Sequence, residues 1–200
     1  MSGRIIVFEG LDGGGKSTLS RGVAEALGAT WMTTPPEALR EVRGVVDDAL
    51  RPWAPAWALF YASTVLAVGR EANVLAAQGA DVIIDRYWAS TEAYAHARGV
   101  DGVLTPLRRH VPRVDLCICV TLDAAERARR PWARGPTALD RETLDSTFGS
   151  AVLEGYRRAL RAGTAARTVA LDVTGLDPEG AREKALRLTA SIPPGARESA

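Results

Sequence analysis

The stretch that decides the fold is Arg4-Ile-Ile-Val-Phe-Glu-Gly-Leu-Asp-Gly-Gly-Gly-Lys-Ser-Thr-Leu19. Its first part, residues 4–8, is a short apolar run that predicts a buried strand, and from Lys16 onward the apolar residues recur at helical spacing. The turn between them has the pattern Gly-x-x-x-x-Gly-Lys-Ser, which in this context is typical of a phosphate-binding P-loop. The stretch therefore predicts a strand, a phosphate-binding turn and a helix, in that order.

The residue types in this turn suit a nucleoside triphosphate. Glycines let backbone N–H groups at a helix N-terminus approach a phosphate without obstructing side chains. Lys16 would reach the β- and γ-phosphates and Ser17 would offer a hydroxyl to Mg²⁺. Of the 25 basic residues only Lys16 and Lys184 are lysines, which suggests that position 16 needs a compact ammonium group. The alternative is a glycine-rich turn without a ligand, and the full pattern in its context favours the P-loop. The predicted ATP-binding residues are Gly10, Gly13, Gly14, Gly15, Lys16, Ser17 and Thr18.

Strands and helices alternate along the rest of the chain. Apolar runs predict strands at 29–33, 81–85, 114–122 and 167–173, and helical spacing predicts helices at 37–50, 56–78, 124–130, 142–161 and 177–189, with a further one after Trp88. There are no repeats and no internal linker. The pattern predicts an α/β fold of the P-loop NTPase type, a central parallel sheet flanked by helices. We expect one domain over residues 1–190 and a polar C-terminal tail over 191–200.

Composition narrows the classes of partner. The apolar share is 46% and the formal net charge is +1, so the chain lacks the basic character expected of a protein that binds a nucleic-acid polymer. No apolar run approaches the roughly 18 residues that predict a membrane span, and no signal-peptide pattern is apparent. We expect a cytoplasmic protein that acts on small phosphorylated ligands.

Charged residues at the carboxyl ends of the predicted strands form a second candidate constellation, because ligands of parallel α/β sheets collect at that edge. Arg86 could hold the phosphate of an acceptor or bridge donor and acceptor in the transition state; alternatively it forms a salt bridge at the start of a helix. Asp12 and Asp85 could each assist Mg²⁺ through water, or Asp12 could hold an acceptor hydroxyl. Glu9 could do either, or could cap the loop.

A third concentration of charge lies at 127–141, where proline and glycine interrupt an arginine-rich segment. This segment predicts a mobile lid that closes over the phosphates, excludes water and adds positive charge to the transition state. The alternative for the first two arginines is a solvated basic helix face. The arginines are Arg127, Arg129, Arg130 and Arg134.

With these motifs in hand, the chain resembles the thymidylate kinases and related nucleoside monophosphate kinases. The matching pieces are the stretch 8–18, Asp85-Arg-Tyr87 followed by Ser90, Ala93 and Tyr94, then Arg98-Gly99, and the arginine-rich segment leading into Asp140-Arg141-Glu142. The resemblance implies transfer of the γ-phosphoryl group of ATP to the 5′-phosphate of a deoxynucleotide, with Mg²⁺ and in a homodimer.

The resemblance also implies roles for particular residues. Lys16, Ser17 and Thr18 would bind ATP and the metal, and Asp12 the sugar 3′-hydroxyl or the metal. Arg86 would hold the acceptor phosphate, Phe60 would stack on the base, and Tyr94 would crowd a ribose 2′-hydroxyl. Some members carry an arginine where this chain has Gly13, so the catalytic arginine would come from the lid, as Arg130 or Arg134.

The acceptor half departs from the family pattern. The family has an arginine-bearing motif after the second strand where this chain has Thr34-Pro-Pro-Glu37. It also has a base-reading arginine at the position of Thr64, and often an asparagine at the position of Thr91. Losing a charge-assisted contact should cost about 2 kcal/mol or more. Arg40 or Arg43 could replace the missing phosphate contact.

Three functions are compatible with these observations. The first is a nucleoside monophosphate kinase that acts on dTMP or a modified analogue. The second is a kinase of a different small acceptor, a nucleoside or a specialised metabolite. The third is a P-loop switch or motor that hydrolyses ATP or GTP, against which the chain has no Asn-Lys-x-Asp guanine motif.

Overall fold

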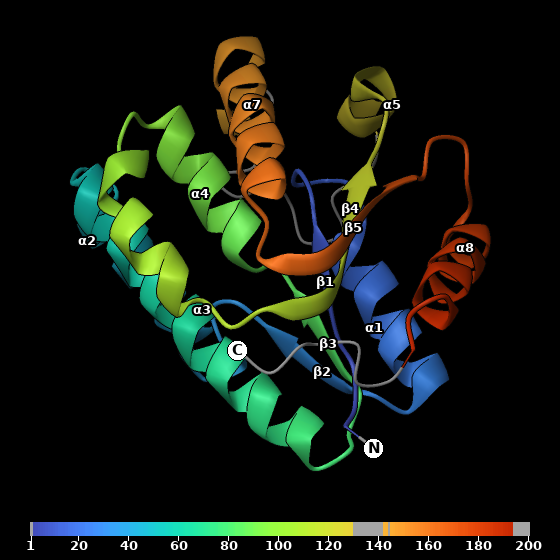
Figure 1. The fold of residues 1–200 in the computed structure, drawn as a ribbon. Helices are drawn as coiled ribbons and strands as arrows, with labels where there is room; N and C mark the ends of the chain where they lie inside the picture. The colour runs from blue at the N-terminus through green and yellow to red at the C-terminus, as the bar shows by residue number, and fades with distance from the viewer. Residues whose placement is uncertain (1, 130–141, 144, 194–200) are drawn as a thin grey trace.

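The computed structural model describes residues 2–129, 142–143 and 145–193. Figure 1 shows a central sheet with helices packed against both faces. Five parallel strands form the sheet in the order β2-β3-β1-β4-β5. The strands are β1 (Ile5–Glu9), β2 (Thr30–Thr33), β3 (Val82–Asp85), β4 (Val114–Thr121) and β5 (Ala165–Asp172). The main helices are α1 (Lys16–Leu27), α2 (Arg43–Leu50), α3 (Ala54–Ala77), α4 (Trp88–Ala97), α5 (Ala124–Arg129), α7 (Ser146–Ala162) and α8 (Pro178–Ala190), and short 3₁₀ turns lie at Glu37–Leu39, Asp101–Val103 and Thr105–His110. The predicted α/β fold with a parallel central sheet is confirmed.

Strand β1 lies at the centre of the sheet and is buried on both faces. Ile5 and Val7 pack into a cluster with α3, whereas Ile6 and Phe8 pack into a cluster with α1 and α8. All of its residues are buried, as expected for a parallel strand covered on both sides. The continuous apolar run in the sequence follows from this position.

The strand register brings three carboxyl ends together. Phe8 of β1 pairs with Asp85 of β3, Thr33 of β2 pairs with the same Asp85, and Glu9 of β1 pairs with Cys119 of β4. The P-loop, Arg86 and the turn after β2 therefore leave the sheet at one edge, where ligands of parallel sheets bind.

The prediction of one continuous helix over residues 37–50 is wrong. The chain forms a 3₁₀ turn at Glu37–Leu39 and then the separate helix α2 at Arg43–Leu50. No residue of either element is buried, so tertiary packing does not support one continuous helix here.

The long helix predicted from residue 142 begins later, at Ser146. The Asp145 carboxylate accepts hydrogen bonds from the backbone N–H groups of Thr147 and Phe148 at 3.0 and 2.9 Å. This is an N-cap, which marks the true start of α7. Glu142 and Thr143 are themselves helical, but they lie before α7 and are separated from it by the bend at Asp145.

The C-terminal boundary also differs from the expectation. Ile192, placed by composition in the polar tail, is 6% exposed and packs into the cluster formed with α1 and α8. Residues 194–200 lie outside the described part. Among the described residues, no helix combines the length and apolar character needed to cross a membrane.

Candidate active site

The P-loop turns sharply from β1 into α1, and two of its glycines have clear physical reasons. At Gly10, with φ of 130°, an added Cβ would lie 2.2 Å from the carbonyl oxygen of Val120, so only glycine fits beside β4. Gly15 is the N-cap of α1 with φ of 79°, in the left-handed region that favours glycine. The first turn of α1 therefore presents its N–H groups at the sheet edge, which is the geometry of an anion site.

Lys16 is buried, with an exposed fraction of 4%. Its ammonium group donates to the carbonyl of Leu11 within the same loop, at 2.6 Å. A phosphate oxygen is a charged acceptor and binds an ammonium group more strongly than a carbonyl does, so Lys16 can exchange this partner for a nucleotide phosphate. Ser17 and Thr18 follow on the first turn of α1 and are exposed to solvent.

Arg86 and Asp12 form an ion pair between the end of β3 and the P-loop. The Arg86 backbone has φ of 69°, which is uncommon for a side-chain-bearing residue and marks a constrained turn. Its N–H donates to the carbonyl of Phe8 at 2.9 Å, and the hydroxyl of Thr34 donates to its carbonyl at 2.9 Å. Both neighbouring strands therefore hold Arg86 in place.

Tyr94 of α4 completes this group. Its hydroxyl donates to the second carboxylate oxygen of Asp12 at 2.7 Å, and both residues are at most 5% exposed. Asp12 is thus shared between Arg86 and Tyr94. Three residues predicted from sequence are brought into direct contact.

Asp85 is 4% exposed, and its Oδ1 atom is buried without a hydrogen-bond partner among the described residues. A buried carboxylate oxygen normally has a partner. An unsatisfied one at the end of β3 is chemically suited to a Mg²⁺ ion or to its water ligands. The described residues contain no group of three or more His, Cys, Asp or Glu side chains arranged to hold a metal.

Glu9 has a different role from those expected. It is fully buried, and one carboxylate oxygen accepts from the backbone N–H groups of Tyr87 and Ser90 at 3.0 and 3.1 Å. The other accepts from the Ser90 hydroxyl, which also contacts the hydroxyl of Tyr156 at 2.8 Å. Glu9 therefore caps the start of α4. Burial raises the pKa of Glu9, and the hydrogen bonds from Ser90 oppose this shift only in part.

Arg127 of α5 lies at the site, whereas its neighbour Arg129 is exposed. The Arg127 guanidinium donates to the carbonyl of Asp12 at 3.4 Å and to that of Thr143 at 2.8 Å. Its exposed fraction is 9%, and burial lowers its pKa. The alternative that these arginines form a solvated basic helix face is therefore wrong for Arg127. It agrees with the exposed position of Arg129. Arg130 and Arg134 lie outside the described residues.

No hydrogen bond among the described residues joins the predicted base-contacting residues to Asp12 or Arg86. Thr64 is 5% exposed, and its hydroxyl donates to the backbone carbonyl of Tyr61 in the same helix at 2.8 Å. Thr91 is 8% exposed and lies 3.5 Å from the carbonyl of Tyr87. Phe60 is partly buried, with its ring edge-on to that of Tyr61 at 5.3 Å.

Arg43 lies in a polar cluster between α2 and α3. Its Nε donates to the Tyr61 hydroxyl at 3.3 Å and lies 3.7 Å from the Asp47 carboxylate. Asp47 also accepts from Tyr61 at 2.7 Å and from the indole of Trp57 at 2.9 Å. Arg43 therefore joins two helices on the acceptor side and makes no described contact with Arg86.

Three residues of the site, Ser90, Tyr156 and Thr34, had no role assigned from the sequence, and Arg127 was predicted only as part of the lid. Tyr156 donates to the carbonyl of Gly10 in the P-loop at 2.9 Å, across 146 positions of sequence. Nothing local in a helical segment distinguishes such a tyrosine from a core residue. For Arg127 the only available signal was its place at the start of the arginine-rich segment.

A family model described as thymidylate kinase matches residues 8–174. A probable thymidylate kinase of Pyrobaculum calidifontis is 31% identical over 187 residues, covering 86% of this chain and 94% of that protein. One from Pyrococcus horikoshii is 32% identical over 149 residues, covering 68% and 73%.

Solved structures have the same fold. The thymidylate kinase of Candida albicans superposes with a TM-score of 0.76 at 21% identity, over 95% of this chain and 92% of that one. The thymidylate kinase of Ehrlichia chaffeensis superposes with a TM-score of 0.71 at 20% identity, over 94% and 100%. The expected P-loop NTPase fold is confirmed.

Proposed function

Because this chain belongs to the thymidylate kinase family, we propose that it transfers the γ-phosphoryl group of ATP to the 5′-phosphate of a deoxynucleoside monophosphate of the dTMP type. Membership makes it an ATP-dependent nucleoside monophosphate kinase. The observation that carries the detailed proposal is the Asp12–Arg86 ion pair. It joins the phosphate-binding turn to a cation at the end of the neighbouring strand.

On the donor side, the N–H groups of 13–16 and the Lys16 ammonium bind the ATP phosphates. Ser17 and Asp85 would hold Mg²⁺ with the nucleotide; Asp85 supplies the buried unsatisfied oxygen described above. When bound there, Mg²⁺ would supply positive charge against the charge that develops on the phosphate oxygens. Lys16 then adds a positive charge to the transferred group, and catalysis consists of positioning and charge stabilisation.

On the acceptor side, Arg86 binds the 5′-phosphate. A guanidinium has five N–H donors, so it can hold a phosphate and keep Asp12 as a partner. Asp12, already fixed by Tyr94, lies beside the sugar. The ion pair thus sets the acceptor phosphate next to the P-loop, where in-line transfer needs it.

Arg127 is our candidate for the catalytic arginine, in place of Arg130 or Arg134. Its two partners in the described part of the chain are carbonyl oxygens, which carry no formal charge. A buried cation is stabilised by an anionic partner, and a phosphoryl group held by the P-loop would be one. This inference rests on described contacts, whereas Arg130 and Arg134 remain proposals from sequence alone.

The two other candidate functions are less well supported. A kinase of another small acceptor would explain Thr64 and Thr91, but the sequence relatives are thymidylate kinases. An ATPase switch would not need a cation such as Arg86 beside the P-loop. The site therefore favours a nucleotide acceptor.

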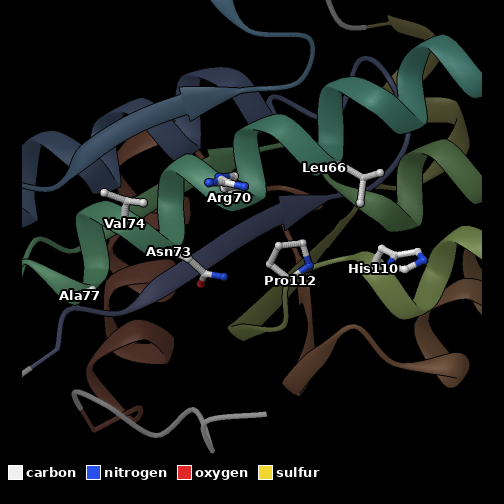
Figure 2. Close-up of a pocket in the computed structure, with 7 residues that line it drawn as sticks. All are labelled: Leu66, Arg70, Asn73, Val74, Ala77, His110 and Pro112. Carbon is white, nitrogen blue, oxygen red and sulfur yellow. The ribbon is translucent and has the colours of Figure 1, made fainter.

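We also propose a homodimer, formed along the exposed face of α3. Leu59 and Val74 are 44% and 51% exposed and lie at helical spacing on one stripe of α3. A pocket lies beside Val74, between α3 and the segment before β4, and Figure 2 shows the side chains that line it. It is lined by Leu66, Arg70, Asn73, Val74, Ala77, His110 and Pro112. Exposed apolar surface beside such a pocket is suited to a second copy of the chain.

For the location we propose the cytoplasm, where the nucleotide substrates of this reaction are found. Cell fractionation with an antibody against the chain would test it. Recovery of the chain in a membrane or secreted fraction would contradict the proposal.

The test of the function is a panel of nucleoside monophosphates, nucleosides and small alcohols, scored for ADP release from ATP. We expect release only with a nucleoside monophosphate, and we expect Lys16→Ala and Arg86→Ala each to lower turnover by about 10²-fold or more. Steady ATP hydrolysis without an acceptor would favour the switch. Normal turnover in Arg86→Ala would remove Arg86 from the site.

A further inference from the structure

Glu142 and Thr143 contact both halves of the proposed active site, although neither was predicted as a site residue. The Glu142 carboxylate accepts from Arg98 at 2.6 Å and lies 3.6 Å from Arg51. The Thr143 carbonyl accepts from Arg127 at 2.8 Å. These consecutive residues therefore join α4 and the end of α2 to Arg127.

Arg98, at the C-terminal end of α4, lies against aromatic rings. Its guanidinium carbon is 5.0 Å from the centre of the Trp57 ring and 5.1 Å from that of Phe148. Such cation–π contacts orient a guanidinium but do not neutralise its charge. Glu142 supplies the negative charge, and its hydrogen bond fixes where Arg98 lies between α3 and α7.

The same rings lead to the acceptor residues. Tyr94 lies 6.4 Å, between ring centres, from both Trp57 and Phe148. Its hydroxyl binds Asp12, which pairs with Arg86. A change in the position of Arg98 would therefore be transmitted through packed aromatic rings to the residues that hold the acceptor.

The donor side is reached through the backbone. Arg127 contacts the carbonyl of Asp12 in the P-loop as well as that of Thr143. Because Glu142 is bonded to Thr143, anchoring Glu142 also limits where the Thr143 carbonyl can lie. One anchored residue thus constrains Arg127 and the acceptor side together.

We propose that Glu142 is a positioning residue of the kinase reaction, which holds Arg98 against Trp57 and Phe148 and Thr143 against Arg127. The inference rests on the proposed function. The Arg98 and Glu142 side chains are 16% and 33% exposed, so their charge-assisted hydrogen bond is less screened than a surface ion pair. Without the carboxylate, Arg51 and Arg98 would each lose the ion pair with Glu142 that the described residues supply.

The test compares Glu142→Gln with the wild-type chain in equilibrium binding to dTMP and to ADP. The substitution keeps the size of the side chain and removes its charge. We expect the dissociation constant for dTMP to rise about tenfold, that for ADP to change less than twofold, and kcat to fall. Equal weakening of both ligands would indicate general damage and would overturn the inference, as would unchanged dTMP binding.

A double-mutant cycle with Arg98→Gln tests the pairing. If Glu142 acts through Arg98, the double variant binds dTMP no more weakly than either single variant; multiplied losses would overturn it. If Glu142→Gln fails to fold, Arg98→Lys tests the positioning role instead, because lysine keeps the positive charge and loses the planar guanidinium. We expect Arg98→Lys to weaken binding of dTMP and not of ADP. The matched control is Glu154→Gln, which removes an exposed carboxylate paired with Arg157 and Arg158 and should change nothing.

Failure of the proposed function would be recognised separately. A wild-type chain that binds dTMP but phosphorylates no nucleotide would contradict the function, while the effect of Glu142→Gln on dTMP binding would still decide the positioning role. A wild-type chain that binds no dTMP would overturn the positioning role of Glu142. The panel of acceptors would still test whether the chain is a nucleoside monophosphate kinase.

Discussion

Charged side chains are buried where β1 meets α1. Glu9, Asp12 and Lys16 are at most 5% exposed, and Arg127 is 9% exposed. Burial of charge is costly unless each group has partners, and here the partners are one another, backbone groups and, as we propose, phosphates. At this scale the site is a set of charges arranged for an anionic ligand.

Arg127→Gln tests whether the buried cation acts on the reaction. Its positive charge lies beside the P-loop, so we expect kcat to fall about 10²-fold with little change in the midpoint of thermal unfolding. Steady-state kinetics with saturating ATP would measure kcat. Arg129→Gln, on an exposed neighbour of the same helix, is the control. Equal turnover in both variants would assign the catalytic role elsewhere.

Thr64→Arg tests the altered acceptor pocket. The hydroxyl of Thr64 donates to a carbonyl of its own helix, so it offers a base less than the arginine that the family resemblance implies at this position. We expect dTMP to be a poorer acceptor for the wild-type chain than for members with that arginine. The substitution should raise kcat/KM for dTMP about tenfold. Ser63→Arg on the exposed neighbour is the control, and family-typical kinetics of the wild type with dTMP would refute a changed pocket.

At the scale of elements, α4 depends on β1 for its N-terminus. The side chain of the N-cap residue, Tyr87, makes no hydrogen bond to the N-terminus of the helix. The Glu9 side chain accepts from the backbone N–H groups of Tyr87 and Ser90 instead. The carboxylate therefore couples the strand before the P-loop to the helix that carries Tyr94.

The pH dependence of stability should report this coupling. Burial raises the pKa of Glu9 above its usual value of 4.5, so the folded chain keeps a proton there that the unfolded chain releases. Its contribution to the free energy of unfolding is complete below pH 4.5 and declines as pH rises through the folded-state pKa. Glu9→Gln cannot titrate. Urea unfolding from about pH 4 to about pH 8 should give a difference between wild type and variant that falls with pH; a constant difference would contradict the assignment.

At the scale of the whole molecule, two helical layers cover the sheet and leave one face of α3 uncovered. Val74→Glu places a charge on that face, and we expect it to convert the proposed dimer to a monomer, as measured by sedimentation. Leu153→Glu is the control, because Leu153 of α7 is 40% exposed and lies off this stripe. A wild-type monomer, or a dimer unaffected by Val74→Glu, would rule out this interface.

The architecture was predictable because its signals are local. The apolar run 4–8 and the helical spacing after Lys16 gave β1 and α1 to within a residue, and Asp85-Arg86 fell at the predicted edge. The helix at 37–50 was wrong in its continuity because its residues are not buried. The start of α7 was missed because the cap at Asp145 decided it.

By itself, the sequence determined the order of strands and helices and the phosphate-binding turn, since glycine spacing, apolar periodicity and the lysine act within a few residues. Only the tertiary structure decided which arginine is buried at the P-loop, that Glu9 caps α4, and that Glu142 binds Arg98. Arg127 and Asp12 are separated by 115 positions. Whether such residues meet depends on how the helices pack across the sheet, and local patterns carry no information about that packing.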